Sequence, residues 1–227
     1  MLALNVALAL APSILLLWWA YRRDTARKDS RRLLGLAFLI GLVAVVPAFF
    51  IGFLAGPLHR VLRGPAALLY QAFVVAALVE EGVKFVVLAG FVGRHRQFNE
   101  ATDGIVYGMA ASLGFAFLEN VLYVSGPSSV LLLRGITAVP LHAGCGAIVG
   151  YYVGRAHFDP RRRASVGLLV AVLVHGAYDA LVFAGGALAY ASLAIIAGLV
   201  VAVPALYRRA LAEDLASGRA KTLRGRP

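Results

Sequence analysis

The 227-residue chain is 61% hydrophobic, only 15% of its residues are charged, and its mean hydropathy is +0.82. Soluble domains have about 45–50% apolar residues, so the composition excludes an ordinary soluble core. It predicts an all-α, polytopic integral membrane bundle. The net charge of +11 does not predict nucleic-acid binding, because the basic residues form short runs between apolar segments and no nucleic-acid-binding motif is present.

Seven apolar segments are long enough to cross a bilayer, since a transmembrane helix needs about 20 residues. They are residues 2–21, 33–55, 67–93, 103–124, 128–154, 165–185 and 187–207. The third and fifth are long, which predicts a tilt or a kink. Only the four residues AGGA separate the last two, which predicts a tight helical hairpin.

The chain is expected to form one transmembrane domain over residues 1–227, with a motif-bearing core at about 67–185 and a basic cytoplasmic tail at 208–227. The first segment has no basic residues before its apolar run, so we expect a retained span and not a signal peptide.

The basic residues predict the orientation. Of the 22 Lys and Arg residues, 18 lie in the tail and in the connections that share its side, whereas Arg60 and Arg63 alone lie in the opposite connections. Basic residues collect on the cytoplasmic side of membrane proteins. We therefore expect a multi-pass protein of the cell membrane with its N-terminus outside and its C-terminus in the cytoplasm.

Small residues recur every four positions in two of the predicted spans. They are Gly104, Gly108 and Ser112 in one span, and Gly146, Gly150 and Gly154 in the other. Such stripes let helix backbones approach closely in a membrane. Extended along the helix, the stripes reach Glu119 and His142, so both polar side chains should face the interior of the bundle.

Ionisable side chains inside the predicted spans are candidates for function. Burial of a charge in a membrane costs free energy, so such residues are rare there and usually have a functional role. They are Glu80, Glu81, Lys84, Glu119, His142, His175 and Asp179, with Asn120 beside them as a supporting polar residue. A helical rise of ~1.5 Å per residue puts the acids and histidines at depths of roughly 15 to 24 Å from the cytoplasmic side. Four helices should therefore meet in one polar layer. Arg134 lies near the outer end of its span, where its side chain can snorkel to the interface, and is left out of this set.

The spacing within the layer suggests separate roles for the two adjacent acids. Lys84 follows Glu80 by four residues and Glu81 by three, so it can pair with either. The two acids point about 100° apart on a helix, so one can neutralise Lys84 while the other faces elsewhere. His175 and Asp179 are also four residues apart, which allows the carboxylate to orient the imidazole.

Four further residues of these segments are assigned structural roles. Pro140, two residues before His142, should open the helix near the polar layer. Thr102 and Asp103 lie where a span begins, so a helix cap is expected there. Cys145 could serve as a nucleophile near His142, but it is interpreted as a small packing residue.

Four motifs resemble those of one family in order and in their distribution over separate spans. The motifs are EEGVK at 80–84, DGIVYGMAASLGFAFLEN at 103–120, LHAGCGAIVGYYVG at 141–154 and HGAYD at 175–179. They resemble the PrsW intramembrane proteases, which are related to the CAAX prenyl endopeptidases and bacterial CPBP proteins. The resemblance covers residues 78–181 and implies an intramembrane endopeptidase that cleaves a membrane-anchored protein in the lipid bilayer.

The resemblance also implies roles for the residues of the layer. Glu80 would be the general base that activates water, and Glu81 would assist it or hold Lys84. His175 and Asp179 would occupy the position that helps to bind the oxyanion in the CAAX branch. His142 and Glu119 would complete the layer, although the CAAX branch has His at the position of Glu119.

Two alternatives remain open at this point. Glu119, His142 and His175 could bind Zn²⁺ as a two-histidine, one-carboxylate set, but the usual HExxH signature is absent, so a mechanism without a cofactor is preferred. A proton-coupled transporter or channel could use the same carboxylates and histidines. The absence of a detectable internal repeat and the order of the motifs favour the protease.

Overall fold

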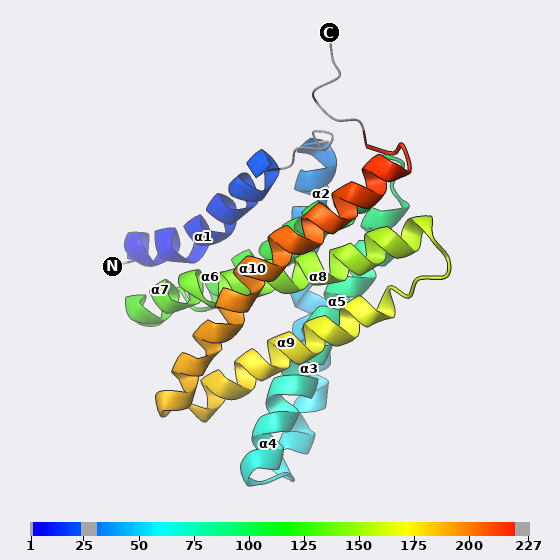
Figure 1. The fold of residues 1–227 in the computed structure, drawn as a ribbon. Coiled ribbons are helices and arrows are strands. Elements are labelled where there is room, and N and C mark those ends of the chain that lie inside the picture. Colours follow the sequence, from blue (N-terminus) through cyan, green and yellow to red (C-terminus); the bar gives the residue numbers. More distant parts are fainter. Residues whose placement is uncertain (1, 24–30, 221–227) are drawn as a thin grey trace.

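The computed structural model describes residues 2–23 and 31–220, and every regular element in those ranges is a helix (Figure 1). The elements are α1 (Leu2–Arg23), α2 (Arg31–Val43), α3 (Val45–Ala55), η1 (Gly56–Arg60), α4 (Gly64–Tyr70), η2 (Gln71–Leu78), α5 (Val79–Val86), η3 (Val87–Phe91), η4 (Val92–Arg94), α6 (Ala101–Leu122), α7 (Ser128–Ile136), α8 (Ala138–Phe158), α9 (Ser165–Ala184) and α10 (Gly186–Ala216).

The predicted helical membrane bundle is confirmed. Six helical stretches of the described residues are long and apolar enough to cross a membrane. In this count α2 and α3 form one stretch, as do α7 and α8. The predicted third span is also helical, but it consists of the short helices α4, η2, α5 and η3 placed end to end.

Two of the spans break close to a proline. The α2–α3 stretch is interrupted at Ala44, three residues before Pro47, and the α7–α8 stretch is interrupted at Thr137, three residues before Pro140. Proline has no N–H to donate to the preceding turn. At the second break the Thr137 hydroxyl donates to the Leu133 carbonyl at 2.7 Å. The prediction that Pro140 opens the helix before the polar layer is confirmed.

The helical segments that precede and follow the EEGVK motif are wider than an α-helix. The segments η2 and η3, before and after α5, are π-helical. A π-helical turn holds more residues than an α-helical turn and often marks a functional site. Here the wider turns flank the short α-helix that carries Glu80, Glu81 and Lys84.

Helices α6 and α8 lie in the middle of the bundle and touch along their glycine stripes. A Cβ atom added at Gly108 would meet the backbone oxygen of Gly146, and one added at Gly150 would meet that of Gly104. The predicted close approach is therefore confirmed. The helices α1, α2, α9 and α10 pack around this pair, so the C-terminal end of α6 and the N-terminal end of α8 are held together at the depth of the polar layer.

The hairpin between the last two helices follows the prediction. Gly185 and Gly186 have φ angles of +71° and +55°, a left-handed conformation that glycine adopts without steric cost. The chain therefore reverses within two residues, and α10 returns along the bundle.

Helix α10 differs from the expected span because it continues past residue 207 to Ala216. Its buried Asp214 accepts hydrogen bonds from the backbone N–H groups of Ala101 and Thr102, at 2.8 and 2.9 Å. The first part of the predicted tail is thus helical and docks on the N-terminus of α6. Residues 221–227 lie outside the described residues.

The predicted cap at the start of α6 is confirmed. Asp103 Oδ2 accepts hydrogen bonds from the backbone N–H groups of Asn99 and Glu100, at 2.6 and 2.9 Å. The Glu100 side chain in turn accepts from the Asp103 backbone, which completes a capping box.

Candidate active site

Side chains from four helices meet in one polar cluster, as the depth argument predicts. The cluster comprises Glu80, Glu81 and Lys84 on α5, Glu119 on α6, His142 on α8, and His175 and Asp179 on α9. Each member lies within 3.5 Å of at least one other, measured between nitrogen and oxygen atoms.

Lys84 is at the centre of the cluster, and its side chain is 3% exposed. Its Nζ atom lies 2.7 Å from Glu81 Oε1, 3.5 Å from Glu80 Oε2 and 2.9 Å from His142 Nδ1. The ammonium also lies 4.4 Å from the centroid of the Phe115 ring, within the range of a cation–π contact. One lysine thus links both acids of its own helix to the histidine of α8.

Each histidine is anchored by a carboxylate. His142 Nε2 lies 2.9 Å from Glu119 Oε2, and His175 Nδ1 lies 2.8 Å from Glu81 Oε1. The two imidazoles meet edge to face, with centroids 5.2 Å apart. Asp179 Oδ2 lies 3.4 Å from the other nitrogen of His175, so both nitrogens of that ring face an acceptor. A carboxylate on one ring nitrogen fixes the tautomer and the orientation of an imidazole.

The two adjacent acids lie in different environments. The Glu81 side chain is fully buried between Lys84 and His175, whereas the Glu80 side chain is 19% exposed. Of this pair, Glu80 lines the cavity described below, and Glu81 does not reach it. The spacing-based expectation that the acids face different ways is therefore confirmed.

The cavity at Glu80 is a groove of about 450 Å³, and Glu119 also lines it. Its walls come from α3, η2 and the C-terminal part of α6, and they are mainly apolar. The lining residues are Val45, Ala48, Phe49, Gly52, Phe53, Gln71, Val75, Ala76, Glu80, Phe115, Glu119, Leu122 and Tyr123. We call this cavity the Glu80 groove. The groove connects the membrane-facing surface of the bundle with two carboxylates of the cluster, Glu80 and Glu119.

The expectation for Arg134 is wrong. Its side chain does not snorkel away from the bundle but is 17% exposed and forms an ion pair of 2.8 Å with Glu119. Its Nε atom donates to Asn120 Oδ1 at 2.7 Å, and Asn120 donates to the backbone carbonyl of Ala9 at 3.3 Å. Arg134 thus connects Glu119 to α1. A basic residue within an apolar segment was the sequence signal for this contact.

The donor atoms that could hold a metal differ from the set expected for zinc. Among the described residues, one group with suitable atoms within 4.8 Å of one another is Glu80, His142 and His175. Glu119 is not in that group because it binds the far side of His142. Two imidazoles and one carboxylate suit Zn²⁺ chemically. The ammonium of Lys84, however, lies against both His142 Nδ1 and Glu80.

Cys145 fits its expected packing role. It is fully buried, and its Sγ atom faces the carbonyl of Ala171 at 3.8 Å. A second group of donor atoms within 4.8 Å joins this thiol to Glu81 and His175, but the Glu80 groove does not reach it.

The chain is thus a polytopic membrane protein with a buried set of acid–base side chains. The family described as PrsW family intramembrane metalloprotease matches residues 29–208. The chain therefore belongs to the PrsW family of intramembrane proteases. No solved structure matches the chain.

Named relatives agree with the family match. Protease PrsW of Geobacillus kaustophilus is 35% identical over 183 residues, which are 79% of this chain and 80% of the relative. Protease PrsW of Shouchella clausii is 35% identical over 178 residues, 77% of this chain and 81% of the relative. Protease PrsW of Bacillus subtilis is 34% identical over 179 residues, 77% and 80% of the two chains.

These findings confirm the resemblance found in the motifs. The protein is an intramembrane protease, a hydrolase of peptide bonds, and a multi-pass membrane protein. Its substrate is a protein embedded in the bilayer. Membership of this family identifies the protein as a protease and not as the transporter or channel that could use the same side chains.

Proposed function

We propose that this protease hydrolyses its membrane-anchored substrate with a water molecule activated by Glu80. The observation that carries the proposal is the difference between the two acids of α5. Glu80 reaches the groove, while Glu81 is enclosed between Lys84 and His175. A general base must come within hydrogen-bond reach of the water that attacks, and only the first of these acids is open to it.

In this mechanism Glu80 removes a proton from water, and the oxygen of the water bonds to the carbonyl carbon of the scissile peptide. The proton then passes to the nitrogen of the leaving amine as the C–N bond breaks. Glu81 holds Lys84 and orients His175. A preorganised donor near the new oxyanion lowers the barrier. We assign this role to the Nε2 atom of His175, because Glu81 fixes the ring through Nδ1 and Asp179 lies 3.4 Å from Nε2, where it balances the charge of the imidazolium.

Glu119 and His142 form the opposite wall of the site. Glu119 binds His142 Nε2 and lines the groove, while Lys84 binds His142 Nδ1. The pair therefore keeps Lys84 between the two walls, and the ammonium offsets the charge of the acids that surround it. In a medium that excludes water, such fixed charges act more strongly than in solution.

The route of the substrate follows from the position of the Glu80 groove. Phe115 contacts Lys84 within the polar cluster, and most of the other lining residues on α3, η2 and α6 lie from there toward the end of the bundle opposite to the basic connections. Phe49 and Phe53 on its rim are 69% and 70% exposed, so the groove opens toward lipid. The substrate segment enters sideways from the outer half of the bilayer and places its scissile bond beside Glu80.

The function is tested by finding the substrate. Membrane proteins from cells with and without this gene are compared by mass spectrometry of their N-termini. We expect a membrane-anchored protein to accumulate uncleaved in the deletion, and purified protease to cleave it in liposomes. Failure of the purified protease to cleave any accumulating protein would contradict the proposal.

A metal-dependent version is the second candidate, because the family description names a metalloprotease and the donor types of Glu80, His142 and His175 fit Zn²⁺. When bound there, the ion would polarise the peptide carbonyl and activate water. We rank this version second because the Lys84 ammonium lies 2.9 Å from His142 Nδ1 and 3.5 Å from Glu80 Oε2. A cation among these atoms would be repelled by it.

We expect Arg134 to act as a positioning residue for Glu119. Arg134→Gln should lower kcat at least about tenfold with little change in KM, because Glu119 would lose the charge-assisted contact that fixes it against His142. Arg134→Lys, which keeps the charge, should recover part of the rate. Steady-state cleavage kinetics measure both variants.

The matched control is Arg155, which forms a comparable arginine–glutamate pair with Glu213, at 2.6 Å, far from the cluster. Arg155→Gln should leave kcat unchanged. Equal loss of kcat in the two Gln variants, or no recovery with Arg134→Lys, would mean that Arg134 only stabilises the fold.

We also propose that the protein lies in the cell membrane with its C-terminus in the cytoplasm. The support is the placement of 18 of the 22 basic residues on that side. We therefore fuse to Pro227 a reporter enzyme that works only in the cytoplasm, and we expect this reporter to show activity. Activity of an exported reporter at the same position would reverse the orientation and the assignment of the groove to the outer half.

A further inference from the structure

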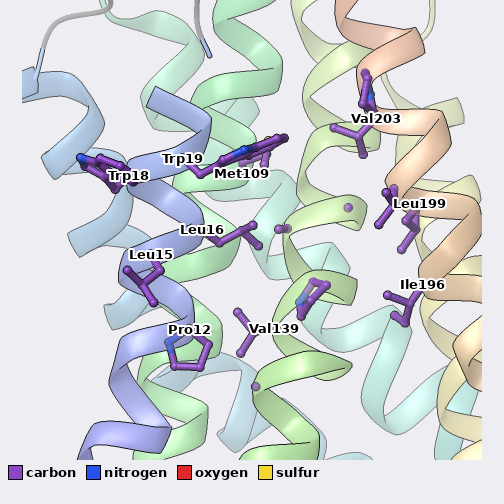
Figure 2. A pocket seen from close by; sticks show the side chains of 16 residues that line it. Pro12, Leu15, Leu16, Trp18, Trp19, Met109, Val139, Ile196, Leu199 and Val203 are labelled. Carbon is purple, nitrogen blue, oxygen red and sulfur yellow. The ribbon is translucent and has the colours of Figure 1, made fainter. Parts of the chain in front are cut away.

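A second cavity lies on the other side of the bundle, away from the polar cluster. It is an apolar groove of about 520 Å³ between α1 and α10, with residues of α6 and α8 at its floor (Figure 2). Leu16 and Trp19 on α1 face Leu199 and Val203 on α10 across it, and Met109 lies between them. We call this cavity the α1–α10 groove.

The α1–α10 groove continues into a further cavity of about 320 Å³ toward the end of the bundle that carries the basic connections. The two cavities share Trp19, Met109, Val203 and Pro204. From Ile196 in the first cavity to Arg208 in the second, α10 rises by about 18 Å. The combined groove is therefore elongated along α10, and its length suits an extended hydrocarbon chain.

The two ends of the combined groove differ. At one end α1 packs against α7, since a Cβ atom added at Gly135 would lie 2.9 Å from Pro12 Cγ. At the other end the lining includes Tyr207 and Arg208. Arg208 is exposed, and no residue that the structure describes forms an ion pair with it. An apolar channel thus ends at a positive charge that has no acidic partner within the described chain.

We propose that the α1–α10 groove binds an anionic phospholipid, with one acyl chain lying between α1 and α10 and the phosphate group on Arg208. The apolar walls match the chain, and the Arg208 guanidinium, which has no acidic partner among the described residues, matches the phosphate. Arginine is well suited to phosphate because it donates several hydrogen bonds in a planar arrangement. Trp18 and Trp19 lie on α1 near the same end, and tryptophan prefers the depth of lipid headgroups.

The chain provides its own probe for this site, because its only two tryptophans both line the groove. The full-length protein is reconstituted in phosphatidylcholine vesicles that contain a low mole fraction of a lipid with brominated acyl chains, which quench tryptophan fluorescence on contact. Brominated phosphatidylglycerol should be enriched about fivefold at the tryptophans over brominated phosphatidylcholine, the ratio expected for one basic residue near an anionic lipid. High salt should weaken this preference.

Two pairs of variants locate the site. Arg208→Gln should reduce the preference for phosphatidylglycerol to the part left by Arg22, whose guanidinium lies 5.0 Å from the centroid of the Trp18 ring. Arg209→Gln, at the exposed neighbour that lines neither cavity, should leave the preference unchanged. Val203→Phe fills the groove and should reduce quenching by both lipids. Val201→Phe should not, because Val201 is 73% exposed on the same helix and lines neither cavity.

Equal quenching by the two brominated lipids in the unaltered protein would overturn the proposal. So would equal loss of the preference in the two arginine variants, since that result would indicate a diffuse attraction to the whole basic surface. If neither lipid quenches the tryptophans and the protein in the vesicles has twice the mass of one chain, a second copy of the chain covers the groove. That result would also overturn the proposal.

Discussion

Substitution of Glu80 by glutamine is expected to lower the rate of substrate cleavage by about 10²- to 10⁴-fold, the range that a general base contributes. The amide keeps the size of the side chain and can still line the groove, but it cannot take a proton from water. Because Glu80 is partly exposed and its contact with Lys84 is the longer of the two, the variant should insert and fold. Single-turnover cleavage of the substrate in liposomes measures the effect.

Asp103→Asn is the control for this experiment. Asp103 caps α6 and lies outside the polar cluster, and the asparagine oxygen can still accept a backbone hydrogen bond, so most of the activity should remain. Comparable loss of cleavage in the two variants would mean that the separation of catalytic from structural acids is wrong.

Substitution of Lys84 by methionine is expected to cause the largest loss of stability in the bundle. Lys84 and Glu81 are both buried and lie 2.7 Å apart. Removal of one partner leaves an uncompensated buried charge, which costs about 3–5 kcal/mol. That is a large part of the ~5–15 kcal/mol that stabilises a typical protein. Thermal unfolding in detergent and the yield of folded protein report the loss.

The double variant Glu81→Gln/Lys84→Met separates lost charge balance from lost packing. Removal of both charges should recover a substantial part of the stability, because a buried ion pair replaced as a whole is often nearly neutral. The double variant should nevertheless be inactive, since His175 would lose its carboxylate. Stability losses that simply add would contradict the view that Lys84 and Glu81 are coupled.

The helical rise and the spacing of polar residues were sufficient to predict that the cluster forms. A residue's depth in the bilayer follows from its distance along a helix from the membrane surface, and helices that cross one bilayer share that scale. Glu80, Glu119, His142 and His175 could therefore be placed in one layer without knowledge of which helices touch. The hairpin of the last two spans was the helix pair that the sequence specified directly, and the glycine stripes predicted close helix approach without naming the partners, which the structure shows to be α6 and α8.

The sequence did not reveal lateral contacts and local changes of helix type. Arg134 is near the end of its predicted span, where snorkelling is the common outcome, but it lies on α7, before the break at Thr137, and pairs with Glu119. The π-helical turns beside α5 have no signal in an apolar run. Glu119 meets the Nε2 atom of His142, while Nδ1 faces Lys84 and, at 4.0 Å, Glu80. Spacing along the sequence does not say which nitrogen of an imidazole each side chain meets.

Metal-depleted protein shows whether Glu80 alone is sufficient to activate water. The purified protease is treated with 1,10-phenanthroline, dialysed, analysed for metal content, and assayed in liposomes against the substrate found in the deletion strain. If Glu80 activates water without a metal, the depleted protein should cleave at the rate of the untreated protein. Cleavage that is lost on depletion and restored by one equivalent of Zn²⁺ would contradict the account and would make Glu80, His142 and His175 metal ligands.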